Sequence, residues 1–246
     1  MYTPTQNGIE KVVRSVRYVE AAPPHNQAEL VHCFWELKTD TALPTDFHYH
    51  VLPDACVDVV FDLHKADMVT IMTPHITSDT LNLGRSFHYV GIRFLPGVWR
   101  EDLEKIVGGF EDTPEIGTMS AANINNKLLA QTFSDQQAIL SQVVDQLADE
   151  NIVSRNYFVA DILTQIDNIH TVADMANIAT MSPRQLQRAL KQMTGFSPHD
   201  FLKVLRLQQS FGQHYLAAYV DQSHFIHSFR KITGYTPRRY VEKFEV

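Results

Sequence analysis

Short apolar segments separated by turn-forming residues make up most of the first 120 residues. Residues 31–39, 54–63, 68–73 and 87–95 are rich in Val, Ile, Phe and Tyr. The segments ALPTD, LPD, TPHITSD, LNLG and LPG lie between or beside them and are typical of turns. Several short strands at this spacing favour a small barrel or a sandwich.

A helical pattern replaces these segments from about Asn123 to Glu150. Apolar residues recur there three or four positions apart, and this spacing predicts amphipathic helix. The stripe leaves three arrangements open, because it could pack on the β-rich part, connect two domains or pair with a second subunit. Its members are Leu128, Leu129, Phe133, Ile139, Leu140, Val143, Val144 and Leu147.

Two segments near the C-terminus are nearly the same, SPRQLQRALKQMTGFSPHDF at Ser182–Phe201 and DQSHFIHSFRKITGYTPRRY at Asp221–Tyr240. In the first, Ser182 precedes a proline and is followed three residues later by Gln185, which predicts a capping box at a helix start. Gly195 is placed to end that helix in a left-handed conformation. The next Ser-Pro pair starts another helix, so the segment predicts two capped helices in succession.

The first of these helices has one apolar and one polar face. Leu186, Leu190 and Met193 follow each other at helical spacing and predict a buried stripe. Upstream, Thr171 and Asp174 form the same cap pattern for a short helix, and the turn ATMS joins the two. Two short helices joined by a tight turn predict a helix-turn-helix. Its outer face carries side chains that can contact bases or phosphates: Arg184, Gln185, Gln187, Arg188 and Lys191.

The second segment repeats this arrangement. Phe225, Phe229 and Ile232 predict the buried stripe, Gly234 ends the helix, and a Thr-Pro pair starts the next one. A helix start is a favourable place for a phosphate. The candidate DNA contacts of this copy are Ser223, His224, His227, Arg230, Lys231, Arg238 and Arg239.

The segment DQSHFIHSFRKITGYTPRRY resembles the signature of the AraC family of bacterial transcription regulators, and the similarity extends from about Ser154 to the C-terminus. That family has two helix-turn-helix units joined by a long helix. The resemblance implies that residues 183–194 and 222–233 are recognition helices, which enter successive major grooves on one face of the DNA ~34 Å apart. The resemblance also suggests RNA polymerase as a partner and a second copy of the chain as a homodimer partner.

The second unit departs from the family's pattern. LQQSFGQHYLAAYV, which links the Arg206 end of the connecting helix to Asp221, is shorter than the corresponding stretch in the family. We therefore expect the first helix of this unit to be shortened or fused with its predecessor, which could hold the recognition helix at another angle. The first unit is the stronger candidate for DNA binding. A regulator with an impaired second unit that acts through protein contacts is an alternative.

The N-terminal half carries a second resemblance. HYHVLPDACVDVVFDL and YVGIRFLPGVW are similar to the sensor domain found in one branch of the same family, which has a barrel-like, cupin-related fold and binds a small-molecule effector. We therefore expect an α+β protein. Residues 1–120 would form the mainly-β sensor domain, 121–153 a helical linker or dimerisation segment, and 154–246 an all-α domain with two helix-turn-helix units. Phe34, Trp35, Phe94 and Trp99 are interpreted as core aromatics.

Charge is unevenly distributed along the chain, whose net charge is −7. From Ser154 onward there are 11 Lys+Arg against 7 Asp+Glu, a balance of +4, and the remainder has 10 against 21, a balance of −11. This asymmetry favours double-stranded DNA at the C-terminal end. The two cysteines form no CxxC pair, no apolar run approaches ~20 residues, and the N-terminus lacks a basic start before an apolar stretch. We therefore expect a cytoplasmic protein without a membrane partner.

The sequence contains no recognisable Ser/His/Asp triad, phosphate loop or nucleophile elbow, so we expect neither an enzyme nor a cofactor. The alternative is a metal-dependent, cupin-type enzyme. His48 and His50 alternate on a predicted strand, where both could point into a barrel, and Asp54 follows them, as in the first motif of metal-binding cupins. A third ligand would be His64, His75 or His88. The second cupin motif is not recognisable, and we expect no metal site.

Overall fold

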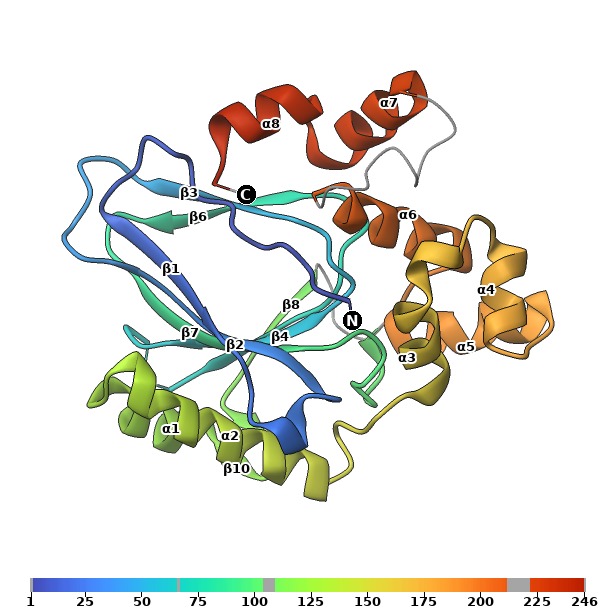
Figure 1. The fold of residues 1–246 in the computed structure, drawn as a ribbon. Helices are drawn as coiled ribbons and strands as arrows, with labels where there is room; N and C mark the ends of the chain where they lie inside the picture. The colour runs from blue at the N-terminus through green and yellow to red at the C-terminus, as the bar shows by residue number, and fades with distance from the viewer. Residues whose placement is uncertain (1, 66, 104–108, 212–221, 246) are drawn as a thin grey trace.

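The computed structural model describes residues 2–65, 67–103, 109–211 and 222–245. These residues form an α+β protein in which the N-terminal part is built on β-sheets and the C-terminal part is helical (Figure 1). Helices lie on both sides of the sheets, and the helical part extends to one end of the molecule. None of the described helices is long and apolar enough to span a bilayer.

Six antiparallel strands form the larger sheet in the order β1-β2-β7-β4-β5-β8. Their bounds are β1 Val16–Ala21, β2 Val31–Thr39, β4 Val57–Asp62, β5 Val69–Met72, β7 His88–Phe94 and β8 Phe110–Thr113. The four predicted strand segments are confirmed as β2, β4, β5 and β7, whereas β1 and β8 were not predicted. A 3-10 turn at His25–Gln27 lies between β1 and β2.

The central strands are almost continuously buried because both faces of this sheet are covered. Phe34, Val59 and Ile92 point to one face and join the core that the following helices complete. Trp35 and Val60, one position along the chain from Phe34 and Val59, point to the other face and join a second core. Adjacent residues of one strand thus belong to different layers.

Helices α1 (Ala121–Leu129) and α2 (Phe133–Asp149) cover the first face (Figure 1). They follow a short pair of strands, β9 (Glu115–Ile116) and β10 (Met119–Ser120). Leu128, Leu140, Val144 and Leu147 are fully buried against the sheet, whereas Leu129 is exposed. Of the three arrangements left open for this apolar stripe, the structure shows packing on the β-rich part.

A two-stranded ribbon of β3 (Phe47–Val51) and β6 (Asp79–Gly84) covers the second face. LNLG, expected to be a turn, is part of β6, so that prediction is wrong. Leu81 and Leu83 alternate with polar residues, and pairing with β3 makes this short alternation a strand. The described strands form separate sheets, and the expectation of a closed, cupin-related barrel stays a prediction.

Four helices after Ser154 form the third layer around their own core: α3 (Tyr157–Thr164), α4 (Val172–Ile178), α5 (Pro183–Thr194) and α6 (Pro198–Gln209). A 3-10 turn at Ile166–Asn168 links α3 to α4. This core includes Leu186, Leu190, Phe201 and Leu205, all fully buried, and Tyr2 and Ala55 from the N-terminal part. The expected domain limits at 120 and 153 stay predictions.

The last helices, α7 (Gln222–Thr233) and α8 (Pro237–Lys243), lie over the β3–β6 ribbon (Figure 1). Leu52 joins the aromatic core beneath them. Main-chain bonds fix the contact: Ser78 donates to the Ile232 carbonyl at 2.9 Å, and Lys11 donates to the Lys243 carbonyl at 2.9 Å. The C-terminal end is therefore hydrogen-bonded to the N-terminal part at separate points.

Candidate nucleic-acid interface and small-molecule cavity

The start of α5 has the predicted capping box. The Ser182 side chain accepts from the Gln185 amide at 3.3 Å, and the Gln185 side chain accepts from the Ser182 amide at 2.9 Å. Pro183 occupies the first turn, where its missing N–H costs no helical hydrogen bond. Gly195 ends the helix at φ 74°, in the left-handed region that glycine adopts without strain. The predicted helix bounds are confirmed.

Helices α4 and α5 are the two short helices of the first predicted helix-turn-helix, joined by a tight turn. Thr171 and Asp174 make the predicted capping box of α4. The turn between the helices includes Thr180 at φ 52°, and the Met181 amide donates to the Ala176 carbonyl at 2.9 Å. The buried side chains of Met175 and Ala176 on α4 share a core with Leu186 and Leu190 on α5. Turn and core together determine how the outer face of α5 is presented.

That outer face is exposed. Arg184, Gln187, Arg188 and Lys191 are all exposed, whereas Leu186 and Leu190 behind them are fully buried. Neither arginine forms an ion pair with a described residue, and Lys191 donates to the Gly195 carbonyl at 2.9 Å. Gln185 is exposed too, but its side-chain oxygen is engaged in the cap, so its amide nitrogen is the group left to contact DNA.

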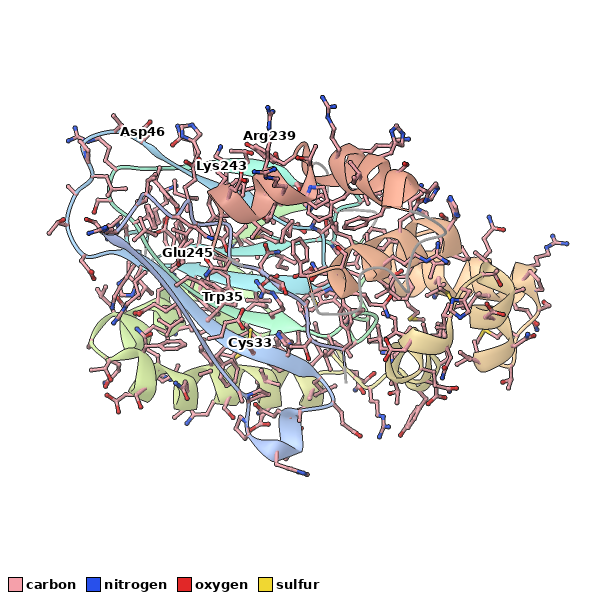
Figure 2. All side chains as sticks on the ribbon, turned by 45° about the horizontal axis from the view of Figure 1, so that its top comes forward. Cys33, Trp35, Asp46, Arg239, Lys243 and Glu245 are labelled. Atoms are coloured by element: carbon pink, nitrogen blue, oxygen red, sulfur yellow. The ribbon has the colours of Figure 1, made fainter. Side chains whose placement is uncertain are left out.

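Helix α7 presents a similar face. Phe225, Phe229 and Ile232 are buried as predicted, and the outer residues Ser223, His224, His227, Arg230 and Lys231 are exposed. At the start of α8, Arg238 forms an ion pair with Glu242 at 2.8 Å, and Arg239 is exposed at the surface (Figure 2). An exposed pair of this kind is weak, so a phosphate can replace the carboxylate. The expected shortening of this unit's first helix falls on residues 212–221, outside the described residues.

The candidate metal ligands are not brought together. Tyr49 and Val51 face the space between the sheets, so His50 faces the other way, where its ring stacks on Phe244 with centroids 4.8 Å apart. His48 is exposed, and Asp54 is buried beside Arg93. The expectation that both histidines could point into a barrel is therefore wrong, because β3 turns their face towards solvent and α8. Of the proposed third ligands, His64 is exposed, His75 packs on Phe110, and His88 contacts Glu36 at 2.9 Å.

One other cluster of residues that can ligate a metal lies within the part of the chain that the structure describes. Glu20, His32 and Cys33 offer ligand atoms within 4.8 Å of one another. The Arg93 guanidinium lies 3.2 Å from Glu20, and it would repel a cation at this point. Burial raises the pKa of the Cys33 thiol and lowers the pKa of His32 to about 4. The thiol is therefore protonated in the metal-free protein.

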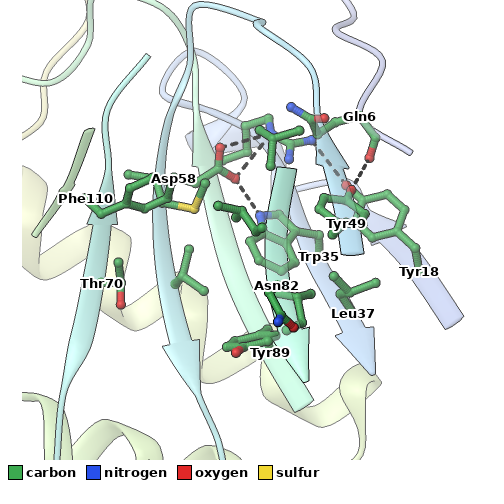
Figure 3. A pocket seen from close by; sticks show the side chains of 16 residues that line it. Gln6, Tyr18, Trp35, Leu37, Tyr49, Asp58, Thr70, Asn82, Tyr89 and Phe110 are labelled. Atoms are coloured by element: carbon green, nitrogen blue, oxygen red, sulfur yellow. Dashed lines mark hydrogen bonds and ion pairs between the residues drawn. The ribbon is translucent and has the colours of Figure 1, made fainter. Parts of the chain in front are cut away.

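A cavity of about 270 Å³ lies between the larger sheet and the β3–β6 ribbon (Figure 3). Its walls are mainly apolar, with several aromatic rings among them. Phe34, Trp35, Phe94 and Trp99 are core residues as predicted, and Trp35 also forms part of the cavity wall. The alternation of Leu81 and Leu83 in the sequence was a signal for this wall that was interpreted as a turn. The aromatic lining residues are Tyr18, Trp35, Tyr49, Tyr89 and Phe110.

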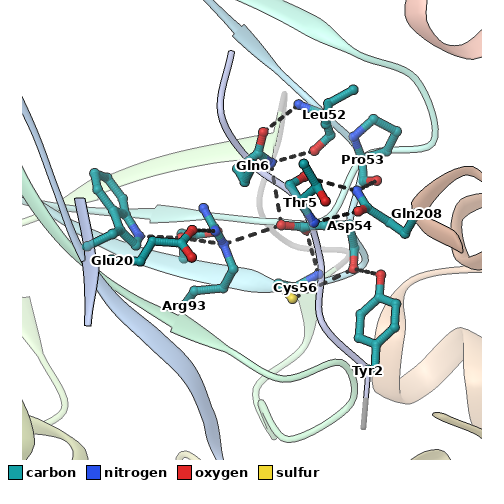
Figure 4. Close-up of polar contacts among 12 residues, drawn as sticks. Tyr2, Thr5, Gln6, Glu20, Leu52, Pro53, Asp54, Cys56, Arg93 and Gln208 are labelled. Atoms are coloured by element: carbon teal, nitrogen blue, oxygen red, sulfur yellow. Dashed lines mark hydrogen bonds and ion pairs between the residues drawn. The ribbon is translucent and has the colours of Figure 1, made fainter. Parts of the chain in front are cut away.

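A buried ionic cluster forms the polar end of the cavity (Figure 4). The Arg93 Nε lies 3.3 Å from carboxylate oxygens of Asp54 and Asp58, and its Nη1 lies 3.2 Å from Glu20. The Trp35 indole donates to Asp58 at 2.7 Å. Burial raises the pKa of Asp58, and it raises the pKa of Asp54 to about 6, although the Arg93 charge opposes both shifts. The sequence signal, missed at first, is a charged residue inside an otherwise apolar strand, in VDVVF and VGIRF.

Strand β3 connects this cavity to the C-terminal helices. Tyr49 lines the cavity, and its hydroxyl donates to the Gln6 carbonyl at 3.0 Å. The adjacent His50 lies among the rings of Tyr235, Tyr240 and Phe244. A displacement of this strand by a bound molecule would therefore reach the packing of α8.

The family described as Domain of unknown function (DUF6597) matches residues 19–113, which is less than half of the chain. No curated protein matches the chain in sequence.

Three solved structures of ToxT from Vibrio cholerae are similar to it. An apo variant has 11% identity and a TM-score of 0.42, covering 92% of this chain and 96% of that one. The 1.65 Å structure has 9% identity and a TM-score of 0.45, covering 92% and 97%. The wild-type protein with bound unsaturated fatty acid has 10% identity and a TM-score of 0.44, covering 99% and 98%. These TM-scores are too low to establish a shared fold.

Proposed function

We propose that the protein is a sequence-specific, DNA-binding transcription regulator of the AraC type, controlled by a small molecule that binds between the larger sheet and the β3–β6 ribbon. The outer face of α5 is the observation that carries this proposal. Arg184, Gln187 and Arg188 project from a helix whose opposite face buries two leucines fully and whose start is held by a capped turn. Arginine can pair with guanine and glutamine with adenine, and Lys191 can neutralise a phosphate.

The second copy supports a bipartite contact. Helix α7 has the same buried aromatic and aliphatic stripe and an outer face that carries Arg230 and Lys231. Arg239 lies in the first turn of α8, where the helix dipole favours an anion. In this proposal the two recognition helices contact neighbouring turns of one DNA face. Contact with RNA polymerase and a homodimer stay predictions from the resemblance.

The small-molecule part of the proposal depends on the cavity and on β3. The cavity is concave, mainly apolar and has polar groups at one end, which are the usual features of a ligand site. Because Tyr49 and His50 point to opposite faces of β3, Tyr49 into the cavity and His50 towards α8, occupancy of the cavity can change how α8 is held. The proposal assigns no reaction, metal or cofactor to this site.

Selection of bound sites from random DNA, followed by footprinting with the full chain, tests the DNA-binding function. Replacing Arg184 and Arg188 with Ala should weaken the selected site by about 1–3 kcal/mol for each lost base contact and relax its sequence preference. The matched control replaces two exposed cations elsewhere, Arg14 and Lys127, and should leave the preference unchanged.

Two outcomes would count against this assignment. Unchanged affinity and preference in the Arg184→Ala, Arg188→Ala variant would show that α5 does not read DNA. A footprint over a single major groove would instead support the alternative in which the second unit is impaired and acts through protein contacts. Protection over two successive grooves is the expected result.

A further inference from the structure

We infer that the cavity between the sheets selects a small, mainly apolar amine that donates a hydrogen bond to Asp58, and that it discriminates against carboxylates. This inference rests on the proposed function, because it defines the chemical class of the effector. It follows from the charges at the polar end of the cavity and from the rings around them.

The size and lining of the cavity limit the ligand. A volume of about 270 Å³ is near the lower end of ligand sites, so a molecule about as large as an aromatic side chain fits. Tyr18, Trp35 and Tyr49 provide aromatic walls close to the polar end (Figure 3). Aromatic faces attract ammonium groups and pack well against apolar carbon.

The polar end has more acidic than basic groups. One guanidinium, Arg93, faces the carboxylates of Glu20, Asp54 and Asp58. Its Nε is engaged with the aspartates, and its Nη1 also donates to the Tyr18 hydroxyl at 3.2 Å. His32 adds no positive charge at neutral pH, because its pKa is lowered to about 4. An incoming carboxylate would therefore add a fourth acidic group beside one guanidinium that is already paired.

Asp58 is the acceptor that an amine would reach. It lines the cavity and accepts from Trp35 and Arg93, whereas a carboxylate can accept about four hydrogen bonds. Burial raises the pKa of Asp58, so the free cavity disfavours its charge. A ligand ammonium would supply the missing positive charge and make a charge-assisted hydrogen bond.

Calorimetric titration of the full chain with three probes of one shape tests the inference: 2-phenylethylamine, 2-phenylethanol and 3-phenylpropionate. We expect the amine to bind about 10-fold or more tightly than the carboxylate, with the alcohol between them, as one charge-assisted hydrogen bond implies. Asp58→Asn, which keeps an oxygen acceptor for Trp35, should lower the affinity for the amine about 10-fold and leave the alcohol nearly unchanged.

A second variant, Leu83→Trp, fills the cavity without touching the ionic cluster and should abolish binding of all three probes. Ligand-induced shifts of Tm in each variant report binding independently. Equal or tighter binding of the carboxylate overturns the inference, as does binding of none of the probes, or an amine preference that survives Asp58→Asn. These titrations contain no DNA. A failed DNA selection with a clear amine preference would therefore overturn the proposed function alone, and the reverse result would overturn only this inference.

Discussion

The two copies of the repeated C-terminal segment have similar outer faces and different surroundings. Helix α5 packs within a core of four helices, to which the N-terminal part contributes Tyr2 and Ala55. Helices α7 and α8 instead share their core with Leu52. They also bond to the N-terminal part through the main chain of Ser78 and Lys11. The first copy therefore has its own helical core with some contacts to the N-terminal part, among them Arg100 to Met193, whereas the second is held against the β3–β6 ribbon.

This difference assigns different tasks to two similar sequences. A helix that is held mainly by its own caps and core is expected to keep its outer face in place when β3 moves. A helix pair that packs on His50 of β3 and on Leu52 directly after it is expected to change its position when β3 moves. We therefore expect α5 to provide constant DNA recognition and α7–α8 to be the copy that responds to the effector.

The largest expected effect comes from truncating one core at a time. Phe229→Ala should destabilise the protein by about 3–5 kcal/mol, because a fully enclosed ring leaves a cavity beneath α7. The loss should reach the N-terminal part, since Leu52 belongs to the same core. Urea unfolding measures the total, and hydrogen exchange of the β3 and β6 amides should show faster opening of the ribbon.

Leu186→Ala is the matched truncation in the first copy. It should cost about 2–5 kcal/mol and leave exchange in β3 and β6 unchanged, because Leu186 belongs to the core of the four-helix layer and not to the core beneath α7 and α8. Faster exchange of the ribbon in this variant would show that the two copies are equally coupled to the N-terminal part.

The pH dependence of stability should further distinguish the second copy from the first. Burial lowers the pKa of His50 from 6.5 to about 4; Lys243 adds to this shift and Asp79 opposes it. At pH values between these two pKa values, His50 is protonated in the unfolded chain and neutral in the folded protein, so a lower pH favours the unfolded state. The contribution of neutral His50 to the free energy of unfolding is complete above about pH 6.5 and is lost as the pH falls through about 4, with a limit of ~3 kcal/mol.

The difference in unfolding free energy between the wild type and His50→Phe isolates this group, because the variant keeps a ring against Phe244 and cannot titrate. The subtraction is needed because His32 and Asp54, with pKa values near 4 and 6, titrate in the same range. We expect the wild type to lose stability relative to the variant as the pH falls from 7 to 4.5. A constant difference would contradict the buried, neutral state of His50.

Features that depend on interactions between residues close in the sequence could be predicted, whereas features that depend on distant residues could not. The bounds of α5 are set within a few residues by Ser182, Gln185 and Gly195, so local pattern was sufficient. The stripe of α2 was also predictable, but its partner surface was not, because the sheet is formed by residues far away in the chain. The cavity was missed for the same reason: Asp58 and Arg93 come from different strands, and only strand pairing brings them together.

The contacts between the N- and C-terminal parts are even less predictable from a local sequence pattern. Gln208 on α6 accepts from the Thr5 amide at 2.7 Å and donates to the Pro53 carbonyl at 2.8 Å (Figure 4). Nothing around Gln208 in the sequence distinguishes it from the neighbouring glutamine. The orientation of His50 towards α8 rather than into a barrel depends in the same way on residues nearly two hundred positions later.

A smaller effect should distinguish the copies on DNA. If both recognition helices bind, replacing Arg230 and Lys231 with Ala should weaken every sequence by a similar factor and reduce the salt slope of binding by about 2, one for each lost phosphate contact. The Arg184→Ala, Arg188→Ala variant should in addition lose sequence preference. Binding measured from 50 to 200 mM salt tests both. An unchanged slope in the α7 variant would limit DNA contact to the first copy.

The smallest expected effect concerns the turn between α4 and α5. Thr180 adopts φ 52°, a left-handed conformation that costs a β-branched residue about 1–2 kcal/mol and glycine nothing. Thr180→Gly removes this strain but adds freedom to the unfolded chain, so the net stabilisation should be below about 1 kcal/mol. Asn177→Gly, an exposed position inside α4, is the control and should destabilise by about 1 kcal/mol. Thermal unfolding that shows equal losses in both variants would mean that the turn stores no strain, and that the angle of α5 is set by the core of Leu186 and Leu190 alone.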